Sequence, residues 1–205
     1  MKRVLLKLIT FIHKRKIEKL LECGSRCEFG LKGKQVSLHM GSTKDCIKLG
    51  DNVRLLGQLI SSNGGQIIIG NNVSIGANTR IRASELIVIG DFCAISEGIV
   101  ICDNNNHPTN PKDREYMQKT PIGSVERSWV YAEHAPIRIG NACWIGENSR
   151  ICKGVTIGNG SIVAANSVVT KSVPDNCIVA GNPAKIVKTD IDKLLLHPTA
   201  SILER

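Results

Sequence analysis

Aliphatic residues recur at every sixth position through the C-terminal half of the chain. In the hexads that end at Pro174 the first position is always Ile or Val (Ile139, Ile145, Ile151, Ile157, Val163, Val169). The fifth position is always small or compact (Cys143, Ser149, Val155, Ser161, Ser167, Val173). A helix repeats every 3.6 residues and a coiled coil every 3.5, so neither explains a period of six. The pattern predicts a solenoid, with one short strand and one corner per hexad and the aliphatic side chain turned inward.

The same repeat continues upstream in a looser form. Gly30, Gly50, Gly70 and Gly90 are spaced by twenty residues. Aliphatic residues fill the first positions of the two middle coils (Ile69, Ile75, Ile81, Ile89, Ile95, Ile101). We interpret each of these longer coils as three hexads plus two residues inserted at one corner. Three hexads per turn predict a mainly β fold, a triangular prism whose faces are parallel sheets.

The sequence divides into residues 1–22, residues 23–188 and a tail of residues 189–205. The first segment is expected to be an amphipathic helix with interleaved Lys and Arg, too short and too charged to span a bilayer. Two roles remain open for it: a cap on the open end of the solenoid, or a contact with an anionic membrane surface. In the tail, the apolar run Leu194–Leu196 is expected to form a helix at a subunit contact.

Composition narrows the functional classes. Aromatic residues make up only 3% of the chain, which suits a narrow interior of stacked Ile and Val. The eight cysteines include no C-x-x-C pair, and several occupy inward positions, so we expect free thiols and a reducing cytoplasm. The net charge of +9 favours solubility or a phosphate-bearing ligand. No basic-aromatic module accompanies the charge, which argues against nucleic acid.

The repeat stops after Ile101 and resumes at Ile137, and residues 107–136 form an excursion without regular periodicity. A loop of this length in a compact domain is usually functional or disordered. It holds three of the chain's seven aromatic residues together with charged side chains, a combination that suits a sugar or a similar polar substrate. The candidate substrate-binding residues are Arg114, Tyr116, Trp129 and Tyr131. A loop that merely covers the flank of the prism is the alternative.

His107 stands at the start of this excursion, directly before Pro108. Proline favours an extended conformation for the residue that precedes it. A neutral imidazole accepts a proton at physiological pH, which is the task of a general base. Asp103, four residues earlier, is predicted to orient the ring.

Together these features resemble the hexapeptide-repeat acyltransferases, a family of left-handed parallel β-helices. The resemblance covers residues 49–188 and is strongest from Ile137 to Lys188, where the tail AGNPAKIVK is especially specific. The chain is similar there to the galactoside, maltose, xenobiotic and capsular-polysaccharide O-acetyltransferases. The left hand is implied by the resemblance alone, because parallel crossovers are usually right-handed.

The resemblance implies a mechanism and a set of site residues. His107 matches the family's general base, which deprotonates the acceptor hydroxyl for direct attack on acetyl-CoA, and Asn78 stands near an active-site asparagine. The residues that the resemblance assigns to coenzyme A are Trp144, Glu147, Ala165, Thr170, Lys171, Lys185 and Lys188. The related enzymes are homotrimers with active sites between subunits and need no metal.

The leading hypothesis is therefore O-acetylation of a sugar hydroxyl, on a surface or capsular polysaccharide or its precursor. We expect a cytoplasmic enzyme, which residues 1–22 could bring to the inner face of the membrane. The same fold also serves N-acetylation of a nucleotide-linked amino sugar and acetylation of a xenobiotic. A zinc enzyme like the γ-class carbonic anhydrases would need three histidines from adjacent coils, and only His107 and His134 are expected to lie near one another. A non-catalytic scaffold is the remaining alternative.

Overall fold

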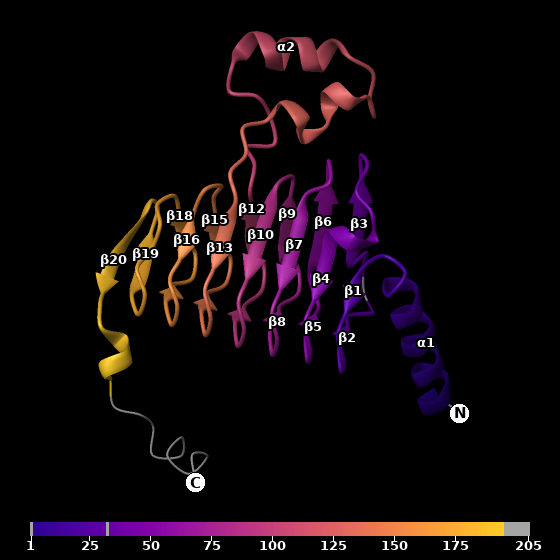
Figure 1. Cartoon of the computed structure of the whole chain (residues 1–205), viewed down its shortest axis with the longest axis vertical. Coiled ribbons are helices and arrows are strands. Elements are labelled where there is room, and N and C mark those ends of the chain that lie inside the picture. The colour runs from indigo at the N-terminus through magenta and orange to yellow at the C-terminus, as the bar shows by residue number, and fades with distance from the viewer. Residues whose placement is uncertain (1, 32, 195–205) are drawn as a thin grey trace.

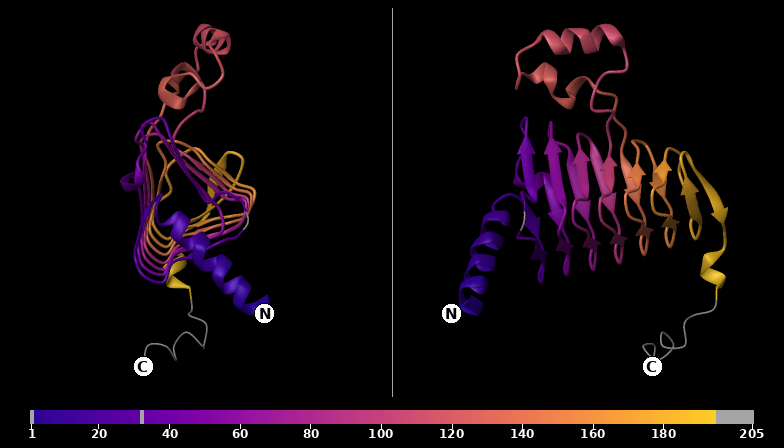
Figure 2. Two further views of the ribbon diagram at one scale, coloured as in Figure 1. Left: turned by 90° about the vertical axis from the view of Figure 1, so that its right-hand side faces the viewer. Right: turned by 180° about the vertical axis from the view of Figure 1, so that it is seen from behind.

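In the computed structural model, which describes residues 2–31 and 33–194, short strands stack into three sheets around a triangular core (Figures 1 and 2). Sheet 1 contains β1 (Glu22–Cys23), β4 (Ile47–Leu49), β7 (Gln66–Ile69), β10 (Leu86–Ile89), β13 (Ile137–Ile139) and β16 (Thr156–Ile157). Sheet 2 contains β2 (Glu28–Phe29), β5 (Arg54–Leu55), β8 (Ser74–Ile75), β11 (Ala94–Ile95), β14 (Trp144–Ile145), β17 (Ile162–Val163), β19 (Ile178–Gly181) and β20 (Ala184–Lys188). Sheet 3 contains β3 (Val36–His39), β6 (Gln58–Ser62), β9 (Arg80–Ala83), β12 (Val100–Cys102), β15 (Arg150–Ile151) and β18 (Val168–Val169).

The chain passes from sheet 1 to sheet 2 to sheet 3 and back, so each sheet pairs strands that lie one coil apart. These pairs are parallel and in register, as in the row Ile75, Ile95, Ile145 and Val163 of sheet 2. Among the described strands only β20 turns back, pairing antiparallel with β19. The prism of parallel sheets predicted from the six-residue period is confirmed.

Aliphatic side chains from all three sheets fill the interior. The first positions of the regular hexads, Ile139 to Val169, are at most 2% exposed, and the fifth positions are at most 5% exposed. Each fully buried Ile or Val contributes about 1.5–3 kcal/mol through removal of its side chain from water. All eight cysteines are free thiols, as expected. Cys93 and Cys143 lie in inward positions, where each Sγ contacts the glycine carbonyl of the next coil, at 3.0 and 3.1 Å.

Asparagine and aspartate hold the corner between sheets 1 and 2, the 1/2 corner. The Asp51 N–H donates to Asn71 Oδ1 at 2.8 Å, the Asn71 N–H to Asp91 Oδ1 at 2.6 Å, and the Asp91 N–H to Asn141 Oδ1 at 2.9 Å. This ladder explains the recurring Gly before each acidic or amide residue. A Cβ on Gly50, for example, would lie 2.6 Å from Asn71 Oδ1.

Between β2 and β3 the first coil is three residues longer than the second, because Phe29 pairs with Leu55 and Leu38 with Ser61. In the later coils the departures from the hexad repeat fall at one place, the corner between sheets 3 and 1, which we call the 3/1 corner. The inward Ile81 and Ile89 are eight residues apart across this corner, whereas Ile151 and Ile157 are six apart. The predicted two-residue insertion is therefore located there. The much longer excursion after β12 leaves the prism at the same corner (Figure 1).

The excursion is more ordered than its aperiodic sequence indicates. It contains α2 (Pro111–Lys119) and two short 3-10 helices, η2 (Val125–Arg127) and η3 (Trp129–Tyr131). Asn110 caps α2, because its side chain accepts a hydrogen bond from the Lys112 N–H at 2.9 Å, and Pro111 occupies the first turn. The excursion forms a lobe that stands off the prism (Figures 1 and 2).

Helix α1 (Lys2–Ile17) lies across the N-terminal end of the prism (Figure 2). It ends before residue 22, because the chain turns there and buries Leu21 in the core together with Ile17. His13 Nε2 contacts the Gly30 carbonyl at 2.8 Å, which fixes the helix to the first coil. A cap on the open end is therefore one of its roles.

The remaining short helices are η1 (Lys44–Cys46) and η4 (Ile191–Lys193). The helix predicted over Leu194–Leu196 extends into residues 195–205, which lie outside the described range. Within residues 2–31 and 33–194, no helix combines the length and apolar character that crossing a membrane requires.

Candidate active site

The excursion begins and ends as two paired segments at the 3/1 corner. The Asn105 N–H donates to the Glu133 carbonyl at 3.0 Å, and the Ala135 N–H donates to the Asp103 carbonyl at 2.9 Å. Asn104 and His134 form an isolated antiparallel β-bridge. His107 lies just beyond this paired base, and its side chain is exposed. The ring is therefore anchored close to the rigid prism while remaining accessible to a ligand.

The prediction that Asp103 orients His107 is wrong. Asp103 is completely buried, and its oxygens accept the N–H groups of Ser84, Glu85 and Leu86 at 2.8–3.1 Å. The side-chain amide of Asn104 also donates to this carboxylate, at 3.1 Å. Asp103 thus holds the preceding coil at the 3/1 corner, because a turn with three inward N–H groups needs an acceptor when it is buried.

Glu133 holds the turn that carries His107. Its carboxylate accepts from the Asn105 side-chain amide at 2.8 Å and from the Thr109 hydroxyl at 2.7 Å, one residue on each side of the segment 106–108. The hydrogen bonds from Thr109 and then Asn105 lower the pKa of Glu133 to about 2. The sequence marks Glu133 only as one of several charges in the excursion, because spacing does not reveal that the two segments pair.

The candidate substrate-binding aromatics lie in two different pockets. Tyr116 and Tyr131 line a pocket of about 310 Å³ inside the lobe, with Pro108, Asp113 and Met117. Trp129 instead lies between the lobe and sheet 3, in a pocket of about 350 Å³ that it shares with His39, Met40, Ile60, Ser62, Arg82 and Ser128. The Trp129 indole N–H donates to Asn106 Oδ1 at 2.8 Å. In the chain, His107 therefore lies between Asn106, which orients Trp129, and Pro108, which lines the tyrosine pocket.

Arg114 braces the lobe rather than facing either pocket. Its guanidinium donates to the carbonyl groups of Pro108, at 3.1 Å, and Thr109. The expectation that it binds substrate is not supported by these contacts. Arg82 is the cation that faces the Trp129 pocket, and its Nε is buried without a partner among the described residues. Burial, and secondly the neighbouring Arg80, lower the pKa of Arg82 below its ordinary value.

A groove on sheet 2 brings together three of the residues assigned to coenzyme A. Trp144, Glu147 and Ala165 line about 390 Å³ of space, with Ser96, Gly146, Ile162, Val163, Ala164 and Ile178. Trp144 is 53% exposed, so the face of its ring is available, and its indole N–H donates to Ser96 Oγ at 3.2 Å. Lys188 pairs in register with Ile178 of the groove, and Lys185 lies on the same strand. An apolar wall with nearby lysines fits a pantetheine chain with phosphates.

Three other predicted residues lie elsewhere. Thr170 and Lys171 follow β18 at the 3/1 corner, on the side of the prism that carries His107 and not in the groove. Asn78 lies at the 2/3 corner, between sheets 2 and 3, in a pocket with Lys34 and Arg80.

Asn78 also has a structural explanation. It has a φ of 60°, and the same conformation recurs in the coils above at Gly98, Asn148 and Asn166. Asparagine and glycine favour this left-handed corner position. Within one chain the site residues thus divide between two corners, with His107, Thr170 and Lys171 at the 3/1 corner and Asn78, Glu147 and Ala165 at the 2/3 corner.

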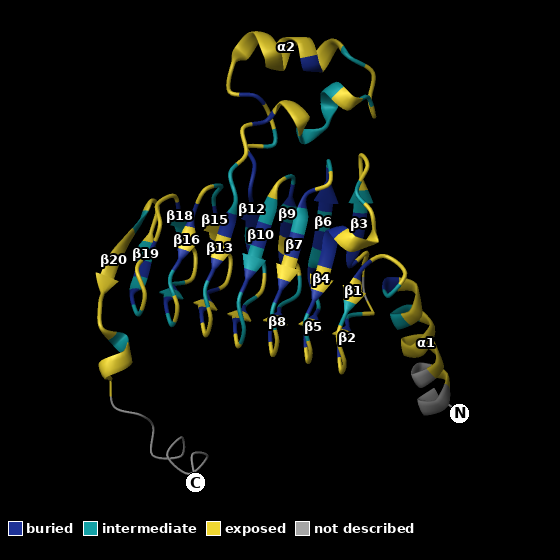
Figure 3. Ribbon diagram, in the orientation of Figure 1, coloured by how far each residue is buried: buried dark blue, intermediate teal, exposed yellow. Residues whose placement is uncertain are grey.

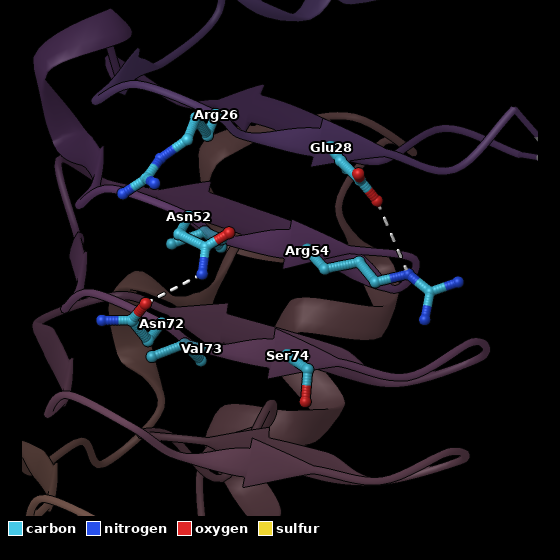
Figure 4. A pocket seen from close by; sticks show the side chains of 8 residues that line it. Arg26, Glu28, Asn52, Arg54, Asn72, Val73 and Ser74 are labelled. Carbon is cyan, nitrogen blue, oxygen red and sulfur yellow. Dashed lines mark hydrogen bonds and ion pairs between the residues drawn. The ribbon is translucent and has the colours of Figure 1, made fainter. Parts of the chain in front are cut away.

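A further open pocket lies over the first coils, near the 1/2 corner, and none of the predicted site residues lines it (Figure 4). The Arg54–Glu28 ion pair, at 3.9 Å, and a hydrogen bond from Asn52 to Asn72, at 2.8 Å, already connect its polar walls.

Comparison with known proteins identifies the family. Residues 136–171 match the model described as bacterial transferase hexapeptide (six repeats). The putative lipopolysaccharide biosynthesis O-acetyl transferase WbbJ of Escherichia coli K12 is 36% identical over 60% of this chain and 61% of its own length. A probable macrolide acetyltransferase of Lysinibacillus sphaericus is 40% identical over 50% of this chain and 59% of its own length. The chain thus spans about three fifths of each of these relatives.

Among solved structures, the hexapeptide-repeat containing acetyltransferase VCA0836 of Vibrio cholerae is 30% identical, with a TM-score of 0.57 over 69% of this chain and 72% of that one. The same Vibrio protein has been solved in complex with acetyl-CoA. This chain belongs to the hexapeptide-repeat acetyltransferase family, and its fold is the left-handed parallel β-helix of that family.

Proposed function

We propose that this chain transfers the acetyl group of acetyl-CoA to a hydroxyl of a sugar, on a surface polysaccharide or its precursor, with His107 as general base. The observation that carries the proposal is the position of His107. Its exposed ring is held at the base of the lobe, next to Asn106, which orients Trp129, and Pro108, which lines the tyrosine pocket. Similarity to WbbJ, named as an O-acetyl transferase of lipopolysaccharide biosynthesis, supports a saccharide acceptor.

In the proposed reaction His107 takes the proton of the acceptor hydroxyl as its oxygen attacks the thioester carbonyl carbon. The carbon–sulfur bond then breaks, and the protonated imidazole returns the proton to the coenzyme A thiolate. The new ester and free coenzyme A balance the reaction. Glu133 contributes indirectly, because it holds the residues on both sides of the His107 turn.

The sheet 2 groove is the proposed site for the donor. Its aliphatic floor and the exposed ring of Trp144 suit the pantetheine arm, while Lys185 and Lys188 suit the phosphates. The complex of VCA0836 with acetyl-CoA supports this choice of donor.

The proposed enzyme is a homotrimer in which the lobe of one subunit faces the groove of the next. The support is geometric: His107 and the groove lie on different sides of one prism, at the 3/1 corner and on sheet 2. One convex prism cannot bring both to the same acetyl group. Light scattering should give a trimeric mass, and a fully active monomer would contradict the arrangement.

The test is acetyl transfer from acetyl-CoA to a panel of glycans, followed by mass spectrometry for the added acetyl group. His107→Ala should lower kcat by about 10²–10⁴, which is the usual contribution of a general base. His134→Ala is a matched control, since His134 is an exposed histidine at the other end of the same excursion, paired with Glu85 at 2.7 Å. Activity of His107→Ala close to that of the unmodified enzyme would exclude the mechanism.

A second acceptor class has support of its own. The stretch that is 40% identical to a probable macrolide acetyltransferase favours a xenobiotic hydroxyl on the same site. N-acetylation of a nucleotide-linked amino sugar remains a further alternative. Adding macrolides and nucleotide-linked amino sugars to the glycan panel separates the three classes, because each product differs in mass and in the atom acetylated.

A further inference from the structure

Helix α1 buries one apolar side chain against the prism and leaves others exposed among its described side chains. Ile17 is buried against the first coil, and the Lys14 ammonium donates to the Cys27 carbonyl at 3.1 Å. A second set of apolar side chains is 47–58% exposed and recurs with the spacing of one helical stripe: Leu5, Leu8, Ile9 and Ile12. Ile12 and Ile17 are five residues apart, which places them about 140° apart around the helix. The exposed stripe therefore faces away from the prism.

This stripe is a large apolar surface for one short helix. Phe11 adds a further exposed ring, at 56%. Figure 3 shows the contrast between the exposed helix and the buried interior of the prism. Scattered exposed apolar residues are ordinary, but a contiguous stripe on one element indicates an interaction surface.

The charge of α1 decides what fits this surface. The segment Lys2–Ile17 contains six basic residues and no acidic residue, including Lys14, Arg15 and Lys16 in its last turn. The Arg15 guanidinium lies 5.4 Å from the centre of the Phe11 ring. A second copy of the same helix would bring like charges together, whereas an anionic surface complements them. An apolar stripe flanked by lysine and arginine is the pattern of a helix that lies in the plane of a bilayer.

The placement of the helix permits such a contact. α1 crosses the N-terminal end of the prism and projects beyond its side (Figures 1 and 2). The stripe residues Leu5, Leu8, Ile9 and Ile12 are exposed on this projecting helix. Sixteen residues give a helix of about 24 Å, shorter than the hydrocarbon core of a bilayer. The helix can therefore lie on a membrane but cannot cross it.

We propose that α1 docks this chain on an anionic phospholipid bilayer, with Leu5, Leu8, Ile9 and Ile12 inserted at the boundary of headgroups and acyl chains. The lysine and arginine side chains contact the phosphate and carboxylate groups of the lipids. The prism then stands with its N-terminal end toward the membrane, and the lobe and the sheet 2 groove remain in water.

Co-sedimentation with vesicles tests this contact directly. The full chain should bind vesicles of phosphatidylcholine with about a third phosphatidylserine, and bind pure phosphatidylcholine far more weakly. Leu8→Gln with Ile12→Gln should weaken binding about tenfold or more, since both side chains are already exposed in the free protein and the change does not disturb its core. Arg15→Gln with Lys16→Gln should weaken binding roughly fivefold per charge, on the anionic vesicles only.

Phe92→Asn is the matched control. Phe92 is 66% exposed at the 1/2 corner, away from α1, and its φ of 59° suits asparagine. This variant should bind both vesicles as the unmodified chain does. Equal binding of the two vesicle types, or binding that the Leu8 and Ile12 changes leave intact, would overturn the proposal. A change of oligomeric mass in the Leu8 and Ile12 variant without a loss of vesicle binding would assign the stripe to a second copy instead.

Discussion

Replacing Asp103 by asparagine distinguishes a corner anchor from a catalytic partner of His107. The carboxylate is completely buried. Its Oδ2 accepts the N–H groups of Glu85 and Leu86, its Oδ1 accepts the Asn104 side-chain amide and the Ser84 hydroxyl, and both oxygens share the Ser84 N–H. An amide keeps only one acceptor oxygen. When the amide oxygen takes the Oδ2 position it keeps all three N–H groups, and the Ser84 hydroxyl can accept from the new NH₂ group. The Asn104 amide then faces another donor and loses its partner.

A lost hydrogen bond to a buried charge lowers the free energy of unfolding by about 1.5–3 kcal/mol. For a chain of this size that corresponds to a decrease in Tm of about 3–12 °C. Differential scanning fluorimetry measures this shift, and acetyl transfer at low temperature measures kcat on the folded fraction. We expect a large loss of stability with kcat per folded molecule changed less than tenfold.

Asp91→Asn is the matched control for this experiment. Asp91 accepts the Asn71 N–H at 2.6 Å in the 1/2 corner ladder, where other coils carry asparagine at the same position. An amide oxygen serves equally well there, so Tm should change by no more than a few degrees. If Asp103→Asn kept its Tm and lost kcat instead, the assignment of Asp103 to the corner would be refuted.

The remaining predictions concern the His107 turn, the groove and the core. Glu133→Gln should loosen the turn and lower kcat more than it changes KM for acetyl-CoA. The pKa of Glu133 is about 2 in the folded protein and higher in the unfolded chain, so its stabilising contribution is full above pH 4.5 and is lost as the pH falls toward 2. The stability of the variant should therefore depend less on pH across that window than the stability of the unmodified chain. Trp144→Ala should raise KM for acetyl-CoA at nearly constant kcat, as steady-state kinetics would show; a change confined to kcat would remove the ring from the donor site. Ile145→Ala, at a completely buried position, should cost about 2–5 kcal/mol in chemical unfolding, whereas Val187→Ala, which is 62% exposed, should cost almost nothing; similar losses for the two would contradict the inward orientation of the hexads.

The fold was accessible from the sequence because every coil obeys the same steric rule. The inward positions of the regular hexads hold only aliphatic or small side chains, so the identities of Ile139 and Cys143 already indicate that these side chains point inward. The residues of the 1/2 corner could also be recognised from the sequence, because the recurring glycine followed by Asp or Asn reflects one hydrogen bond that is repeated from coil to coil. The handedness required the resemblance, because the period is the same for either hand.

The excursion obeys no repeat, and its interior could not be predicted. The proximity of Asp103 and His107 in sequence suggested that the two are partners, but the carboxylate instead accepts three N–H groups of the adjoining coil. Trp129 and Tyr131 are close in sequence but lie in different pockets, because η3, which contains both, turns one ring toward sheet 3 and the other into the lobe. Such contacts depend on how the two ends of the excursion pair, which no local pattern encodes.

The period nevertheless constrains function in a way that residue types alone do not. Counting hexads assigns each residue to a corner, and this count by itself separates Asn78 from His107. From the second coil onward the departures from the hexad fall at the 3/1 corner, first as two residues and then as the excursion after β12. A solenoid tolerates insertion where a corner points to solvent, since the neighbouring coils still pair across the gap, as Ile101 and Ile151 do. The lobe could therefore acquire aromatic pockets and a histidine without disturbing the wall of sheet 2. Because the sheet 2 groove and the 3/1 corner with His107 lie on different sides of one prism, a second prism is the simplest way to bring them together.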